Sequence, residues 1–196
     1  MAHYLRAKEG GRTNPLPHYN GVPAASPEYS SPAYLGDAYA PFAVSDDPNR
    51  PSFQVPNIGL ADESENRRLS DRIVLRTSLD KMERAFDSEG ELGALDEFEA
   101  QSATLLTNPH TRDAFDLSKV DAAIRDWYGR NRWGQQLLLA RGIVESGVEI
   151  VTSSLSGPLC GRANNWDDNA VNQHQFESLR FRMPTYDRAV SALIED

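Results

Sequence analysis

Residues 131–168 read NRWGQQLLLARGIVESGVEIVTSSLSGPLCGRANNWDD, and this stretch decides the fold. Its first part carries apolar residues at helical spacing on two stripes: Trp133, Leu137, Ala140 and Val144 on one, Leu139 and Ile143 on the other. A helix of this kind is expected to be buried on two sides. Gly147 follows the last periodic residue, where a glycine in left-handed geometry closes a helix without steric cost. Residues 148–152 are rich in β-branched side chains and predict a short strand.

A polar loop follows the predicted strand, from 153 to 172. Because ligands in open α/β sheets gather beyond the carboxyl ends of strands, any chemistry is expected in this loop. The loop and the residues just after it offer carboxylate, amide and imidazole groups: Asn164, Asn165, Asp167, Asp168, Asn169, Asn172 and His174. Hard cations or zinc bind such donors. Turn-forming Asn and Asp residues that cap backbone groups explain the same composition equally well, and His174 is interpreted as a loop or helix-start residue.

The composition of the chain excludes several classes of protein. The net charge of −9 and the absence of a basic stripe argue against binding to nucleic acid or to an anionic membrane surface. The single cysteine, Cys160, excludes an internal disulfide framework and a cysteine-built metal site. No apolar run approaches membrane-spanning length, and the first residues lack the hydrophobic core of a signal peptide. Localisation and oligomeric state are left open by the sequence.

Residues 1–65 hold most of the twelve prolines, interleaved with Gly, Ser and Asn. This composition excludes regular helix almost throughout, and we expect an irregular wrap or tail. The segment also contains several aromatic residues, among them Tyr34, Phe42 and Phe53. Disordered linkers are usually poor in aromatic residues, so we expect these side chains to dock onto a neighbouring body.

Residues 66–128 have a helical pattern and are predicted to form a helical insertion. Apolar residues from Leu69 to Phe86 keep helical spacing and predict an amphipathic helix, which Gly90 ends. A second helix is expected to end before Pro109, because the residue before a proline is disfavoured in helices. Two antiparallel helices would result.

Two short helices are then expected around 112–115 and 120–128, and a last one from Pro184, which suits a first helical position. Residues 129–196 therefore read as a helix, strand, loop and helix of an α/β core. One predicted strand cannot form a sheet, and a parallel partner requires a crossover connection. We expect the chain to be an incomplete α/β domain, a piece of something larger.

Other reactive side chains have simpler explanations. A Cys160 thiolate would have a lowered pKa beside the positive charge of Arg162, but no histidine base is near in sequence, and a small half-buried cysteine is the commoner case. The serines at the predicted strand end lack the G-x-S-x-G pattern of a hydrolase elbow and are interpreted as strand-end and loop residues: Ser153, Ser154 and Ser156.

Charged and aromatic residues also surround the predicted long helix. Three arginines form a candidate anion clamp, although charges at helix starts are common without a ligand: Arg130, Arg132 and Arg141. Trp127 and Trp133 are expected in the core, whereas Trp166, beside two carboxylates, is expected over a pocket rim.

Five collinear runs between residues 34 and 196 resemble a known family. They are YAPFAVSDDPNRPSFQVPNI, DRIVLRTSLDKMER, LTNPHTRDAFDLSK, YGRNRWGQQLLLARGIVESGVEIV and NWDDNAVNQHQFESLRFRMPTYDRAVSALIED. Together they resemble the sulfatase-like family catalogued as domain of unknown function 1501, whose activity is largely unassigned. The most specific parts are YGRNRWGQ, LARGIVESGVEIV and the tryptophan-aspartate loop.

The resemblance implies an alkaline-phosphatase or sulfatase-like α/β domain, helix-rich and with few strands in this chain, that holds divalent metals with Asp and His at strand ends. Family members read W-D-x-H in the loop, so Trp166 and Asp167 match, while Asn169 takes the histidine position. The implied metal ligands are Asp167 first and Asp168 second, with zinc or calcium as the cofactor. An amide oxygen such as that of Asn169 coordinates hard cations but is a poor zinc ligand.

Family members also carry an earlier segment with metal-ligand aspartates and a later one like GEFGRTP, and neither occurs here. Cys160 does not match the C-x-P-S-R pattern of sulfatases. Full-length relatives commonly have a twin-arginine export signal. The resemblance thus predicts that the chain is a fragment of a metal-dependent hydrolase of phosphate or sulfate esters. Its partner would be the remainder of the parent domain, and without it the chain is expected to be inactive.

Two alternatives to this hydrolase fragment stay open. The first is a non-enzymatic binding or secreted-surface protein that keeps the fold without the metal, which Asn169 favours. The second is a helical interaction module with residues 69–106 as its contact face.

Overall fold

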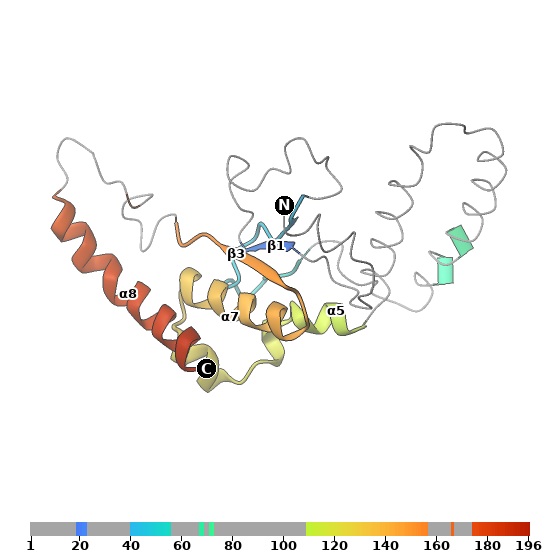
Figure 1. The fold of residues 1–196 in the computed structure, drawn as a ribbon. Helices are drawn as coiled ribbons and strands as arrows, with labels where there is room; N and C mark the ends of the chain where they lie inside the picture. Colours follow the sequence, from blue (N-terminus) through green and yellow to red (C-terminus); the bar gives the residue numbers. More distant parts are fainter. Residues whose placement is uncertain are drawn as a thin grey trace, which may run out of the picture.

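The computed structural model describes residues 19–22, 40–55, 67–68, 71–72, 109–156, 166 and 174–196 (Figure 1). Its strands are β1 (Tyr19–Val22), β2 (Phe42–Ala43) and β3 (Ile150–Ser153). Its helices are α5 (Pro109–Ala114), the 3₁₀ turn η3 (Leu117–Lys119), α6 (Ala122–Tyr128), α7 (Arg132–Glu145) and α8 (Gln175–Glu195). The helices expected between 66 and 106 lie outside the described residues, except for 67–68 and 71–72, which are helical.

The three strands form one parallel sheet in the order β2-β1-β3. The described part of the chain is therefore helix-rich α/β, as the sequence predicts. The prediction of a single strand missed β1 and β2, which come from the segment expected to be irregular. β1 contains Asn20-Gly21, a pair typical of turns, and β2 is two residues long and follows Pro41. Pairing with the neighbouring strands, and not local propensity, makes these residues extended.

The register of the sheet determines which side chains meet α7. Asn20 pairs with Val151, and Val22 with Ser153, so these four side chains share one face. Val22 is fully buried and belongs to the same core cluster as Leu139 and Ile143 of α7. Figure 1 shows α7 lying along the sheet, so this helix covers that face. Each large side chain buried here contributes about 1.5–3 kcal/mol.

The end of α7 forms as the sequence predicts, and its start is capped by a side chain. At its start the Asn131 side chain accepts a hydrogen bond from the Gly134 amide, at 3.0 Å. Gly129 and Gly147, before and after the helix, have φ of 95° and 98°, values that favour glycine. The Val148 amide donates to the carbonyl oxygen of Ile143. Because this bond closes the helix, Val148 does not enter the ladder, and β3 begins at Ile150 instead of at the predicted 148.

The last helix, α8, starts earlier than predicted. It begins at Gln175, with His174 as its N-cap, and Pro184 lies inside it. The prediction of Pro184 as the first helical residue is wrong, because the first turn is already closed by Glu177 and Ser178 amides that donate to the His174 carbonyl. Pro184 is exposed, so water can reach the carbonyl of the preceding turn that loses its intrahelical donor.

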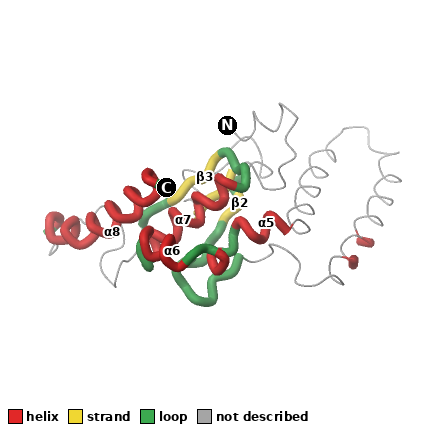
Figure 2. The backbone as a smooth tube through the Cα atoms, turned by 90° about the horizontal axis from the view of Figure 1, so that it is seen from below, coloured by secondary structure: helices red, strands yellow, loops and turns green. Residues whose placement is uncertain are grey.

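The C-terminal half of α8 packs on α6 and α7, while its N-terminal half extends away from the body (Figure 2). Ala189 and Ala192 are buried in this contact. Arg188 donates to the main-chain oxygens of Trp127 and Asp126. Trp127 is 39% exposed, so its predicted place in the core is wrong. Among the described helices, none has the length and hydrophobicity needed to span a membrane.

Candidate functional site

The parallel strands end on one side of the sheet, at Val22, Ala43 and Ser153, and we call this side the carboxyl edge. Since α7 runs back along β3, its first turn lies beside the residues that follow β3. The indole nitrogen of Trp133 donates to the main-chain oxygen of Ser156, at 3.3 Å. Helix start and strand end are therefore joined at the edge where α/β proteins bind ligands.

Trp166 is fixed against this edge by four contacts. Its ring stacks on Trp133 with centroids 5.5 Å apart and an interplanar angle of 20°. Its indole nitrogen donates to the Leu155 oxygen at 2.7 Å, and its ring meets Tyr186 edge to face. The guanidinium of Arg182, a residue only 4% exposed, lies 5.9 Å from the Trp166 ring centre. Trp166 thus covers the buried Trp133 and leaves 43% of its own surface exposed.

Most of the polar residues predicted in the loop lie outside the described residues, among them Asp167, Asp168, Asn169, Asn164, Asn165, Asn172 and Cys160. His174 is described and is the helix-start residue that the sequence predicts. Its ring contacts Phe176 with centroids 5.6 Å apart. Within the described part of the chain, no three His, Cys, Asp or Glu side chains are grouped to hold a metal ion.

The serines at the end of β3 occupy the positions predicted for them. Ser153 is the last residue of the strand, and the hydroxyls of Ser154 and Ser156 lie 3.1 Å apart. The Ser153 hydroxyl is buried and has no hydrogen-bond partner.

Two of the three candidate clamp arginines have structural partners. Arg130 pairs with Asp126 one helical turn earlier. Arg141 lies 3.1 Å from Glu145 and 2.9 Å from Asp196, which ties α7 to the end of α8. Arg132 differs, since its Nε atom is buried without a partner and no ion pair links it to another described residue.

Two consecutive glutamines of α7 have opposite environments, although both are fully buried. The Gln135 oxygen accepts from Arg125 Nε at 2.7 Å, and its nitrogen donates to the oxygens of Arg125 and Gly129, each at 3.0 Å. Gln136 has no partner for either amide atom. Sequence reasoning missed Gln136. The sequence does hold one signal for it: Gln136 places a polar side chain at a position where the helical pattern predicts burial.

Two residues of α6, Arg125 and Tyr128, have shifted pKa values. Burial, followed by repulsion from Arg130, lowers the pKa of Arg125. Burial raises the pKa of Tyr128, and the hydrogen bond from its hydroxyl to Asp196, 2.9 Å long, raises it further. The hydrogen bonds of these groups link α6 to α7 and to the end of α8.

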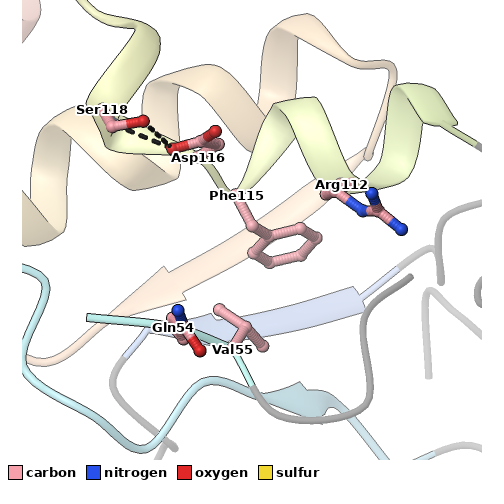
Figure 3. Close-up of a pocket in the computed structure, with 6 residues that line it drawn as sticks. All are labelled: Gln54, Val55, Arg112, Phe115, Asp116 and Ser118. Carbon is pink, nitrogen blue, oxygen red and sulfur yellow. Dashed lines mark hydrogen bonds between the residues drawn. The ribbon is translucent and has the colours of Figure 1, made fainter. Parts of the chain in front are cut away.

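A cleft of about 350 Å³ lies between residues 54–55 and the α5–η3 turn (Figure 3). Phe115 and Val55 form its apolar wall, and Arg112 and Asp116 flank the Phe115 ring. The Asp116 carboxylate accepts bonds from the amide and hydroxyl of Ser118, so it caps η3. Among the described residues that line this cleft, the one carboxylate is therefore already hydrogen-bonded within the η3 turn.

A parallel sheet backed by a helix defines a helix-rich α/β protein, and proteins of this class commonly bind ligands at the carboxyl edge of the sheet. Residues 4–196 match the family described as "Protein of unknown function (DUF1501)", and the chain belongs to this family. The membership of domain of unknown function 1501 that the sequence predicts is thereby confirmed. Comparisons with curated proteins and with solved structures gave no significant match.

Proposed function

We propose that this chain is part of a metal-dependent hydrolase of phosphate or sulfate esters, related to the alkaline phosphatase and sulfatase superfamily. The rest of the catalytic site is supplied by the remainder of the parent domain. The observation that carries the proposal is the placement of Trp166, which stacks on Trp133 and donates to Leu155 at the carboxyl edge. Asp167 follows Trp166 directly in the sequence.

The donors of the loop suit a hard cation. Asp167 is the first-choice ligand and Asp168 the second, while Asn169 offers an amide oxygen where relatives have histidine. Oxygen donors of this kind favour calcium or magnesium, whereas zinc prefers imidazole or thiolate. A bound metal stabilises charge on the ester oxygens and lowers the pKa of a nucleophile.

The test is a thermal melt of the purified chain in chelator and then with calcium, magnesium or zinc. A ligand of the native state raises its stability, so one of the metals should raise the Tm. Asp167→Asn should abolish the shift. Asp187→Asn, an exposed carboxylate on α8, is the matched control and should keep it. Asn169→His should shift the metal preference toward zinc.

A melt that is indifferent to all three metals would overturn the proposed metal site of this chain. It would favour the alternative that Asn169 suggests, a binding protein that keeps the fold without the metal. A shift of equal size in wild type and Asp167→Asn would place metal binding elsewhere and remove Asp167 from the site.

A further inference from the structure

Three unpartnered polar groups lie where the first turns of α7 meet the end of β3. Arg132 Nε, both amide atoms of Gln136 and the Ser153 hydroxyl are buried without a hydrogen-bond partner. A buried polar group without a partner costs about 1–3 kcal/mol, so a native chain that keeps three together requires an explanation.

Helical geometry places the first two groups on the same side. Positions 132, 136, 139 and 143 follow one another at three- and four-residue spacing and so form one stripe of α7. The last two positions are Leu139 and Ile143, fully buried in the core shared with Val22 of β1. The stripe therefore faces the sheet, and Arg132 and Gln136 are its members nearest the carboxyl edge.

The strand register brings the third group to the same place. Ser153 pairs with Val22 and points to the face that α7 covers, at the last position of β3. The hydrogen bond from Trp133 to Ser156 fixes the helix start beside this strand end. Helical spacing and strand register thus place Arg132, Gln136 and Ser153 on facing surfaces of α7 and β3, at the carboxyl edge.

We propose that Arg132, Gln136 and Ser153 form a subsite for a tetrahedral oxyanion, and we call it the oxyanion subsite. Each of the three residues supplies an N–H or O–H donor, and the Gln136 oxygen can accept from a protonated oxyanion. An anion also compensates the charge of Arg132, for which no ion pair is found within the described ranges. Arg182 adds a second, nearly buried cation beside Trp166 at this edge.

The inference rests on the proposed function for its biological meaning, because a phosphate or sulfate ester carries such a group. It assigns the three residues to binding the ester's anionic end. A single bound water is the competing occupant, since it also forms three or four hydrogen bonds, but water would leave Arg132 without a counter-charge.

The experiment is a titration of inorganic phosphate, and separately of sulfate, into the full chain in the presence of chelator. Sodium chloride at matched ionic strength is the reference, and calorimetry and the Tm are the readouts. Phosphate or sulfate should bind and raise the Tm beyond the chloride reference. Gln136→Met and Ser153→Ala should each weaken binding about tenfold or more, because each removes a hydrogen bond to a charged group.

Ser154→Ala is the matched control, since its hydroxyl lies one residue farther along and bonds to Ser156. This variant should bind the anion as wild type does. Failure of both anions to bind would overturn the subsite and leave water as its occupant, and so would equal binding by all four proteins. Because chelator is present, these outcomes are independent of the metal melt, and either proposal can fail alone.

Discussion

Replacing either of the two adjacent glutamines of α7 with methionine is expected to change the free energy of unfolding in opposite directions. Gln135→Met removes three hydrogen bonds and leaves the carbonyl oxygens of Arg125 and Gly129 without their donor. Each buried group left unpaired costs about 1–3 kcal/mol, so we expect a loss of about 3 kcal/mol in the free energy of unfolding. Methionine keeps nearly the same length and flexibility, so little of this loss comes from a cavity.

Gln136→Met breaks no hydrogen bond, because neither amide atom has a partner in the described part of the chain. The substitution removes a buried amide whose desolvation is uncompensated. We expect the variant to be as stable as wild type or more stable by about 1–2 kcal/mol. The two variants should therefore differ by roughly 4 kcal/mol, although the substitutions are chemically identical.

Urea unfolding followed by circular dichroism, in chelator and without phosphate, measures both free energies. The m-values should match that of wild type, because neither change alters the surface exposed on unfolding. An equal loss from both substitutions would refute the reasoning, since it would mean that Gln136 is as fully hydrogen-bonded as Gln135. Added phosphate should raise the free energy of unfolding of wild type and leave that of Gln136→Met nearly unchanged.

Four further substitutions test other parts of the structure. Gly134→Ala should destabilise by about 1–3 kcal/mol or more in urea melts, because a Cβ there would lie 2.2 Å from the Tyr128 main-chain oxygen. Gly142→Ala, whose Cβ would have a nearest contact at 3.4 Å, should be neutral or stabilising by up to about 1 kcal/mol. Pro184→Ala should raise the stability of α8 by roughly 1–3 kcal/mol, and an unchanged melt would mean that the helix is broken at this residue. Stability should fall above about pH 10, because the raised pKa of Tyr128 keeps its proton in the folded state while the unfolded chain releases it. Tyr128→Phe should reduce the fall in Tm between pH 8 and 11. An equal fall in Tm for wild type and variant would mean that the Tyr128 hydroxyl does not cause it.

The parts of the fold that the sequence predicted are those with local causes. The helix over α7 follows from its apolar spacing, and the glycines at 129 and 147 close the flanking turns because only glycine adopts their φ without strain. The short helices α5 and α6 likewise follow from local pattern.

The parts that the sequence missed depend on contacts between distant segments. β1 and β2 contain turn-forming or proline-flanked residues, and they become strands by pairing with β3 and each other. Pro184 was expected to begin a helix because proline suits a first helical position, whereas α8 begins at Gln175 and continues through Pro184. The predicted site residues Asp167, Asp168 and Asn169 lie outside the described residues, so they stay predictions.

The candidate site was predicted in part. The loop after β3 was expected to carry the site, and Trp166 of this loop contacts Trp133 and Leu155 at the carboxyl edge, while its place over a pocket rim stays a prediction. Gln136 and Ser153 were not predicted as a pair, because a sequence does not reveal which buried polar atoms lack partners.

Calorimetric titration of calcium, magnesium and zinc into the chelator-treated chain tests the central claim most directly. The account predicts saturable binding of one of these metals at a single site, lost in Asp167→Asn and kept in Asp187→Asn. Absence of binding by all three metals, or binding that Asp167→Asn leaves unchanged, would contradict a metal site beside Trp166 at the carboxyl edge.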